Sequence, residues 1–340
     1  MYTALRRLLF KLDPELSHDF SLELLSAAER LRILSLFTPN LPFVPVKVMG
    51  LDFPNPVGLA AGLDKNARCF NALGALGFGF VEVGTVTPRA QSGNARPRLF
   101  RLDEDQAIIN RMGFNNDGVD GLVERVRHRR YRGVLGINLG KNKVTPEEYA
   151  LSDYLVGMQK SYAVADYIAI NISSPNTPGL RNLQYGDALN KLISGIADER
   201  EKLSDKHARR VPVAVKVAPD NDDETLKAIV DTLMKHGIDA VIATNTTLSR
   251  EGLSSDYSDE VGGLSGAPLR ERSTSVISTL HSLSGGELPI IGVGGIDSAD
   301  DALEKIRSGA SLVQLYTGFI YQGPKLIEDT VLALQEEMRK

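Results

Sequence analysis

The sequence contains a single cysteine, Cys69, and no tryptophan among its 340 residues. One cysteine cannot build an intramolecular disulfide framework or a cysteine-based zinc cluster, which indicates a reducing compartment. Neither charge dominates, since 39 basic and 43 acidic residues give a net charge of −4. Nucleic-acid-binding domains are usually strongly basic, so nucleic acid is not the expected partner.

Long apolar runs are missing as well. No segment approaches the roughly 18 uninterrupted apolar residues that identify a membrane-spanning helix. The N-terminus has basic residues but lacks the apolar core and cleavage site of a signal peptide. We therefore expect a soluble protein or one that contacts a membrane only peripherally.

The first 37 residues carry two amphipathic helical patterns. The first has leucines at i, i+3, i+4 and i+7, namely Leu5, Leu8, Leu9 and Leu12. Three cations lie between them, at Arg6, Arg7 and Lys11. The second has its apolar face at Phe20, Leu24, Ala27, Leu31 and Leu34, and a proline-containing linker follows at 38–45. On this pattern alone, two interpretations stay open: a cap packed on the main domain, or a helical hairpin that meets a membrane surface.

From residue 46 onward, short apolar runs alternate with amphipathic helical stretches. Eight runs are nearly continuous in apolar character, as in strands buried on both faces: Val57–Ala60, Phe80–Gly84, Val134–Asn138, Tyr167–Asn171, Val213–Val217, Ala240–Thr244, Pro289–Val293 and Ser311–Tyr316. Helices are predicted between them, for example at Asp117–Arg129, Asp187–Lys202, Glu224–His236, Ala299–Arg307 and Lys325–Lys340. The pattern predicts a (β/α)8 TIM barrel at 44–340 behind an extension at 1–43, with a hairpin at 46–53 plugging the barrel bottom.

Reactive groups of such a barrel lie at the carboxyl ends of its strands. Gly294, Gly295 and Gly318 follow the last two strands, where this fold commonly binds a phosphate. Lys216 lies inside an apolar strand, and its alternation with Val215 and Val217 places it on the other face, toward the lumen. A buried ammonium is costly unless it faces an anion or a polar cavity.

The remaining polar groups at the strand ends are amides and hydroxyls, at Asn110, Asn115, Asn138, Asn171, Asn176, Asn245, Thr244, Thr246 and Ser174. Each amide offers a donor and an acceptor, which suits a ring with alternating N–H and C=O groups such as a dihydropyrimidine. No histidine or carboxylate pair joins them, which argues against a catalytic triad, a glycosidase or a metal site. The difficult chemistry is therefore expected from a phosphate-bearing cofactor, and FMN fits.

Motifs along the chain, among them AGLDKNA (61–67), NRMGFNN (110–116), NISSPNTPGL (171–180) and GVGGI (292–296), occur in the order typical of one family. Over nearly its whole length the chain resembles the class 2, quinone-linked, membrane-associated dihydroorotate dehydrogenases of Gram-negative bacteria. The resemblance implies FMN-dependent oxidation of (S)-dihydroorotate to orotate in pyrimidine (UMP) synthesis, with ubiquinone or menaquinone as the electron acceptor.

The resemblance also implies roles for individual residues. It assigns FMN to Ala61, Gly62, Leu63, Asp64, Lys65, Thr85, Asn138, Asn171, Lys216, Thr244, Gly266, Gly295, Tyr316 and Thr317. It assigns substrate to Lys65, Asn110, Arg111, Met112, Gly113, Phe114, Asn171, Asn176, Asn245 and Thr246. Ser174 matches the catalytic base, where the soluble class 1 enzymes have cysteine, and Thr317 stands where serine is more frequent.

The family places its quinone entrance between two N-terminal helices, which favours the membrane interpretation of residues 1–43. We accordingly expect a monomer held peripherally on the cytoplasmic face of the inner membrane, with no metal. The alternative from the residues alone is a non-redox phosphate-binding barrel, an isomerase or lyase. Such an enzyme would be colourless and would need a catalytic carboxylate or a Schiff-base lysine.

Overall fold

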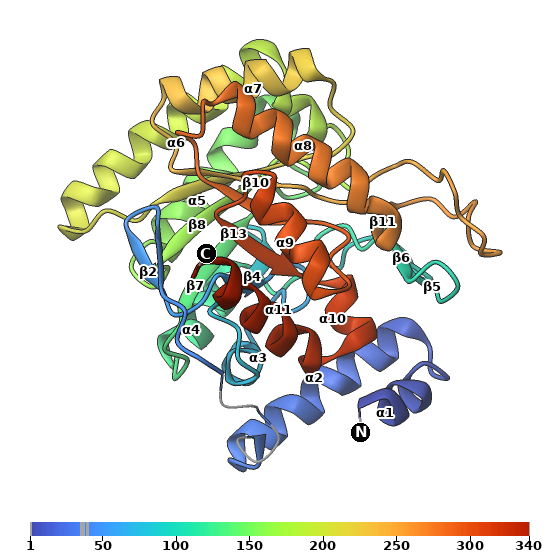
Figure 1. The fold of residues 1–340 in the computed structure, drawn as a ribbon. Coiled ribbons are helices and arrows are strands. Elements are labelled where there is room, and N and C mark those ends of the chain that lie inside the picture. The colour runs from blue at the N-terminus through green and yellow to red at the C-terminus, as the bar shows by residue number, and fades with distance from the viewer. Residues whose placement is uncertain (1, 35–37, 39–40, 340) are drawn as a thin grey trace.

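The computed structural model describes residues 2–34, 38 and 41–339, and within them eight parallel strands close into a barrel (Figure 1). In barrel order the strands are β3 (Val57–Leu59), β4 (Phe80–Val86), β7 (Val134–Leu139), β8 (Tyr167–Asn171), β9 (Val213–Val217), β10 (Ala240–Ala243), β12 (Ile290–Val293) and β13 (Leu312–Leu315). The last strand pairs with the first. The predicted TIM barrel is confirmed, and the bounds of β8 and β9 agree with the predicted runs at both ends.

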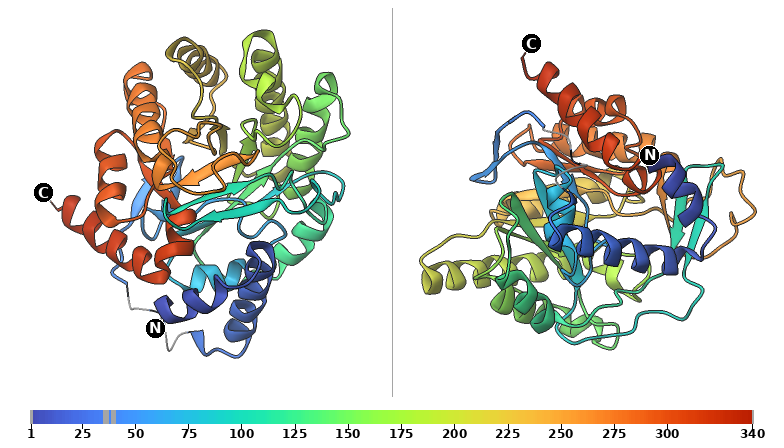
Figure 2. Two further views of the ribbon diagram at one scale, coloured as in Figure 1. Left: turned by 90° about the vertical axis from the view of Figure 1, so that its right-hand side faces the viewer. Right: turned by 90° about the horizontal axis from the view of Figure 1, so that it is seen from below.

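Helices surround the barrel (Figure 2). They are α3 (Phe70–Ala75), α4 (Val119–Arg127), α5 (Ala150–Ser161), α6 (Gly186–His207), α7 (Asp223–Lys235), α8 (Arg270–Leu283), α9 (Ala299–Arg307), α10 (Thr317–Gln322) and α11 (Pro324–Glu337). The 3-10 turns are η2 (Glu147–Tyr149), η3 (Leu180–Gln184) and η4 (Ala267–Leu269). Each predicted helix has its counterpart here, although residue 340 of the last prediction lies outside the described residues.

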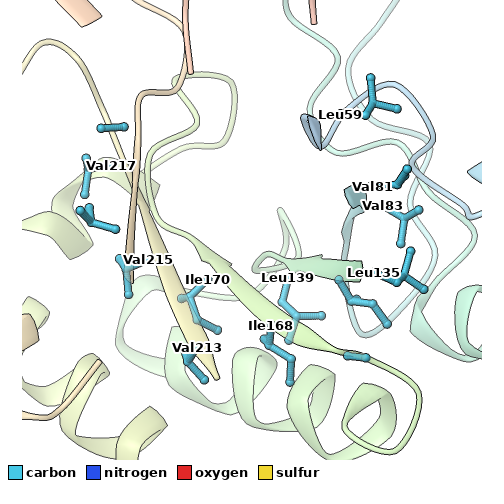
Figure 3. Packing of buried hydrophobic residues seen from close by; sticks show 14 of the residues in the cluster. Leu59, Val81, Val83, Leu135, Leu139, Ile168, Ile170, Val213, Val215 and Val217 are labelled. Carbon is cyan, nitrogen blue, oxygen red and sulfur yellow. The ribbon is translucent and has the colours of Figure 1, made fainter. Parts of the chain in front are cut away.

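Strand β9 shows how side chains are divided between the two faces of the barrel wall. Val213, Val215 and Val217 belong to the outer cluster that packs against the helices (Figure 3). Ala214 belongs to the inner cluster that fills the lumen. Because side chains alternate along a strand, Lys216 also faces the lumen, as predicted.

The hairpin of β1 (Val46–Val48) and β2 (Leu51–Phe53) lies at the amino ends of the barrel strands. Val48 and Phe53 join the inner cluster, and Phe53 meets the first residue of β4, Phe80, in an edge-to-face contact with ring centroids 5.3 Å apart. The predicted plug at the barrel bottom is therefore present. It seals the lumen with aromatic rings and leaves the other end for polar groups.

Two N-terminal helices, α1 (Tyr2–Leu9) and α2 (Pro14–Arg30), lie against one flank of the barrel beside α3 and α10 (Figures 1 and 2). Asp13 caps α2 by accepting hydrogen bonds from the amides of Glu15 and Leu16, both at 3.0 Å, and Pro14 starts the helix. None of the described helices combines the length and apolar character needed to cross a bilayer. Of the predicted linker, residues 39–40 lie outside the described part of the chain.

A three-stranded antiparallel sheet that the sequence did not predict adjoins the carboxyl end of the barrel. It consists of β5 (Leu99–Leu102), β6 (Ala107–Asn110) and β11 (Gly263–Gly266), in the order β11-β6-β5. The first two strands lie in the segment after β4, and β11 lies in the segment after β10. The sheet therefore brings Asn110 opposite Gly263 across the barrel mouth.

We predict that Phe53→Ala lowers the free energy of unfolding by about 3–5 kcal/mol, because it opens a cavity between the plug and Phe80. Urea denaturation of the purified protein measures this loss. Phe43, which is 73% exposed, supplies the control, and Phe43→Ala should shift stability by no more than about 0.5 kcal/mol. Equal stability of Phe53→Ala and the parent protein would show that the plug does not help to hold the barrel.

Candidate active site

A cavity of about 130 Å³ opens at the carboxyl ends of the barrel strands. Of the residues that the resemblance assigns to the site, all but four line it: Ala61, Gly62, Lys65, Thr85, Asn110, Met112, Gly113, Phe114, Asn171, Ser174, Asn176, Lys216, Thr244, Asn245, Thr246, Gly266, Gly295, Tyr316 and Thr317. Gly294 and Gly318, predicted for the phosphate, are also part of its wall. Segments from all around the barrel thus converge on one space.

Lys216 and Gln314 line this cavity, and each has a polar side-chain atom without a hydrogen-bond partner among the described residues. Lys216 is 5% exposed, and no described residue accepts a hydrogen bond from its Nζ. Gln314 Oε1 is buried and has no hydrogen-bond partner among the described residues. The isoalloxazine ring of FMN carries both N–H and C=O groups, so it can satisfy this donor and this acceptor. The residues present therefore fit the predicted flavin.

Glu82 is a buried carboxylate beneath the cavity that the sequence analysis did not single out. Its Oε1 accepts a hydrogen bond from Asn138 Nδ2 at 2.7 Å. Its Oε2 accepts from the Tyr167 hydroxyl at 2.7 Å and from Gln314 Nε2 at 2.8 Å. Burial lowers the pKa of the Lys216 ammonium, and the negative charge of Glu82 opposes that shift. Glu82 thus supplies the counter-charge that helps this barrel to retain a lumen cation.

A line of hydrogen bonds continues from this carboxylate to the cavity wall. Thr85 Oγ1 donates to Asn138 Oδ1 at 2.6 Å and accepts from Asn171 Nδ2 at 2.9 Å. Asn171 Oδ1 in turn accepts from Asn245 Nδ2 at 3.3 Å. These partners fix which way each amide points, so the cavity presents an ordered set of donors and acceptors.

Ser174 lies in the loop after β8 and is 6% exposed. Its Oγ accepts a hydrogen bond from the backbone N–H of Asn176 at 3.3 Å. Asn176 Nδ2 donates to the Asn110 carbonyl at 3.0 Å, which joins this loop to β6. The Thr177 hydroxyl of the same loop is buried and has no partner among the described residues. The loop therefore places two shielded hydroxyl groups, at Ser174 and Thr177, close together in the chain.

The glycine-rich corner predicted for a phosphate has little room for side chains. Gly295 has a φ of 70°, and a Cβ there would lie 2.4 Å from the amide nitrogen of Arg270, the first residue of α8. Across the corner, Thr317 Oγ1 donates to Ser265 Oγ at 2.8 Å. Ser265 lies on the unpredicted β11, so sequence reasoning missed it as a wall residue.

Lys65 lies where the cavity meets the loop after β3. Its Nζ donates to the Gly62 carbonyl at 2.8 Å. Burial, followed by the positive charge of Arg98, lowers the pKa of Lys65 to about 8. The ammonium is therefore mostly charged at neutral pH, and it can attract an anion in the cavity.

Four residues that the resemblance assigns to the site do not line the cavity, and neither does Asn115 of the strand-end polar groups, which borders another cavity. Asn138 lies beneath it between Glu82 and Thr85, and Asp64 is buried where its carboxylate accepts from the amides of Arg68 and Cys69. Leu63 borders a neighbouring apolar cavity instead. Arg111 Nη1 turns away to Glu260 Oε2 at 2.5 Å. The first three still support the site from behind, whereas the side chain of Arg111 is engaged elsewhere.

The neighbouring cavity encloses about 630 Å³ between the N-terminal helices and the barrel. Its walls are mostly apolar and include Leu5, Leu9, Phe10, Leu22, Leu25 and Phe319. His18 and Arg101 are among its few polar groups. Burial, followed by the positive charge of Lys65, lowers the pKa of His18 to about 3, so its imidazole is neutral at pH 7. Tyr316 lines both this cavity and the polar one.

Comparison with known proteins agrees with this geometry. The family model of dihydroorotate dehydrogenase matches residues 43–338. The chain belongs to the dihydroorotate dehydrogenase family. The resemblance inferred from the motifs is thereby confirmed.

Among curated relatives of this family, proteins named dihydroorotate dehydrogenase (quinone) are similar along nearly their whole length. The one from Saccharophagus degradans is 61% identical, covering 98% of this chain and 99% of its own. The one from Cellvibrio japonicus is 60% identical, covering 96% of each chain. A crystal structure of the Eimeria tenella family member in complex with ferulenol superposes with a TM-score of 0.88 at 40% identity, covering 96% of this chain and 92% of that one.

We predict that orotate binds more weakly as the pH rises through the pKa of Lys65. If the anion needs the protonated ammonium, the Kd should stay level below pH 7 and rise about tenfold by pH 9. Titration of the flavin absorbance with orotate measures it. In the matched variant Lys65→Arg the side chain stays charged, so the rise should disappear. The same rise in both proteins would assign it to another group.

Proposed function

We propose that this chain oxidises (S)-dihydroorotate to orotate with FMN and passes the electrons to a membrane quinone. The observation that carries the proposal is the meeting of two cavities at Tyr316. One is polar and suits a flavin and a pyrimidine, and the other is apolar and suits a quinone. A cofactor between them can react in turn with two substrates that enter from different sides.

FMN bound in the polar cavity supplies the hydride acceptor and later the electrons for quinone. With FMN bound there, the Lys216 ammonium would offset negative charge on the ring. Ala61, Gly62, Thr85, Thr244 and Tyr316 would shape the ring site, while Gly266, Gly295 and Thr317 would enclose the phosphate.

The amides of Asn110, Asn171, Asn176 and Asn245 provide the donors and acceptors that a dihydropyrimidine ring needs. Lys65 provides the positive charge for its carboxylate. Met112, Gly113 and Phe114 close the cavity beside them. This arrangement orients the substrate before any bond changes, which is a large part of the catalytic effect.

In the proposed reaction Ser174 Oγ removes a proton from the carbon beside the ring carbonyl, and the adjacent carbon gives up its hydride to the acceptor that bound FMN would supply. A serine hydroxyl is a weak base at its ordinary pKa, so its own proton must move on to water or a neighbouring hydroxyl. The unpartnered Thr177 hydroxyl in the same loop is chemically suited to this transfer. Burial of the loop keeps bulk water from competing.

The apolar cavity between the N-terminal helices and the barrel would admit the quinone, and residues 1–43 would serve as the access segment of the catalytic barrel at 44–340. Leu8, Leu16 and Phe20 are 64%, 64% and 53% exposed and do not line the cavity. Large apolar side chains facing water on amphipathic helices suit contact with a lipid surface. We therefore propose a monomer attached peripherally to the cytoplasmic face of the cell membrane.

The alternative of a non-redox isomerase or lyase has no support among the curated relatives described above, which are named as quinone-dependent dehydrogenases. The optical spectrum of the purified protein tests the proposal against it. Dihydroorotate should bleach a flavin band, and added quinone should restore it. A colourless protein that cannot be loaded with FMN would overturn the proposed function.

We predict that Ser174→Ala keeps the flavin and binds orotate but reduces flavin about 100-fold more slowly or worse. Stopped-flow absorbance after mixing with dihydroorotate measures the rate. Ser152→Ala is the control, because Ser152 is an exposed residue in the first turn of α5, and among the described residues its hydroxyl donates only to the Tyr149 carbonyl. Flavin reduction at the parent rate in Ser174→Ala would remove Ser174 from the mechanism.

We predict that Phe20→Glu weakens vesicle binding about tenfold or more, because a carboxylate replaces an apolar anchor. Turnover with a long-chain quinone in those vesicles should fall in parallel, while a short, water-soluble quinone should react at the parent rate. Met234→Glu is the control, since Met234 is a 39% exposed residue of α7, across the barrel from α2 (Figure 1). Equal vesicle binding by Phe20→Glu and the parent would refute the membrane role.

A further inference from the structure

The first turns of α2 have two chemically different sides. Pro14, Ser17 and His18 line the apolar cavity. Glu15 is absent from that wall and is 7% exposed on the side facing the residues before β5. A carboxylate this well buried needs compensating charge and hydrogen bonds. The residues that supply this charge and these hydrogen bonds show which segment helix α2 is attached to.

Arg98 and Arg96 provide those partners. Arg98 Nη2 donates to Glu15 Oε1 at 2.7 Å, and Arg98 Nε donates to Glu15 Oε2 at 3.1 Å, which makes a two-pronged contact. Arg96 Nη2 adds a bond to Glu15 Oε1 at 2.9 Å. Burial raises the pKa of Glu15, but the hydrogen bonds from Arg98 and Arg96 outweigh it and hold the pKa below its usual value. Glu15 is therefore an anion at neutral pH.

The other edge of the Arg98 guanidinium holds the loop before β5. Its Nη1 donates to the carbonyls of Ser92 at 2.7 Å and Asn94 at 2.8 Å. Because a guanidinium is planar and rigid, fixing one edge on Glu15 fixes the direction of the other. Helix α2 and residues 92–94 are thus joined through a single buried side chain, Arg98.

Asn94 carries this connection to the loop of the proposed base. Its Nδ2 donates to the Arg111 carbonyl at 2.9 Å and to the Asn176 carbonyl at 3.3 Å, and its own amide donates to the Met112 carbonyl at 3.0 Å. The backbone N–H of Asn176 then donates a hydrogen bond to Ser174 Oγ. Neither Glu15 nor Asn94 lines the substrate cavity, so both act on it only through other residues.

We propose that Glu15, Arg98 and Asn94 are positioning residues for the dehydrogenation step. They hold Asn176, and through it Ser174 Oγ, in the orientation needed to take the proton from dihydroorotate. The N-terminal helices then serve the reductive half-reaction as well as quinone access. This inference rests on the proposed function, and in particular on Ser174 as the base.

The test separates the two half-reactions in the full-length flavoprotein. Asn94→Ala and Glu15→Gln should each slow flavin reduction by saturating dihydroorotate about tenfold, because small displacements of a base are costly. Reoxidation of the reduced flavin by a short, water-soluble quinone should keep the parent rate. Loss of the Asn176 hydrogen bond also makes the Ser174 anion less stable, so the pH profile of flavin reduction should shift to higher pH.

Glu29→Gln is the matched control. Glu29 lies near the other end of α2 and pairs with Arg130 of the barrel, so its loss also removes a glutamate–arginine pair between this helix and the barrel, although a more exposed one. Among the described residues, no hydrogen bond joins this pair to the Ser174 loop. Glu29→Gln should leave flavin reduction unchanged. The double variant Glu15→Gln/Asn94→Ala should be no more than about twofold slower than the worse single variant, because both changes break one connection.

Three results would overturn the inference: parent-like flavin reduction in Asn94→Ala, equal slowing of both half-reactions, or single effects that multiply in the double variant. Equal slowing would indicate general destabilisation. Multiplied effects would indicate independent roles. Failure of the proposed function itself is distinguishable, since dihydroorotate would then not bleach the flavin of the parent protein.

Discussion

The structure depends on placing a buried lysine, Lys216, beside a cavity in the barrel lumen. Its ammonium would be costly in an apolar interior, and Glu82 reduces this cost from below without forming a hydrogen bond to it. Glu82 is already occupied by Asn138, Tyr167 and Gln314, so the donors of Lys216 remain available to a ligand. The lumen is therefore divided into an aromatic layer at the bottom and a polar layer at the mouth. The chemistry follows from that division.

The two sides of the polar layer are closed by different means. On one side the β5-β6-β11 sheet and the Ser174 loop shield the proposed pyrimidine site through backbone pairing and amide hydrogen bonds. On the other side α1 and α2 leave an apolar cavity that reaches Tyr316. Such separation suits a reaction with one polar and one lipid-soluble substrate, because each can approach the same flavin without displacing the other.

Much of this arrangement follows from the sequence because it depends on local periodicity. The alternation of Val213, Val215 and Val217 with Lys216 assigns the barrel faces, and the polar residues after each apolar run mark the cavity. The rest depends on contacts between distant segments. In the sequence Glu82 is one polar residue within an apolar strand. Its role depends on hydrogen bonds from Tyr167 and Gln314, which lie far from it in the chain. Likewise, β11 is a glycine-containing tetrapeptide whose partner strand lies some 150 residues earlier. The position of the Arg111 side chain depends on an ion pair with Glu260, which is equally distant in the chain.

The Glu15–Arg98 pair is better understood as a geometric device than as a source of stability. Replacing a buried ion pair by apolar residues is often neutral or stabilising, since both charges must be removed from water. The pair does fix the direction of a planar guanidinium, which apolar packing cannot do. Because the pKa of Glu15 is lowered on folding, the charge that fixes Arg98 is present at neutral pH and is lost only as the pH falls through that lowered value. The connection between α2 and the Ser174 loop is therefore constant over the physiological range, as a positioning contact must be and a pH switch is not.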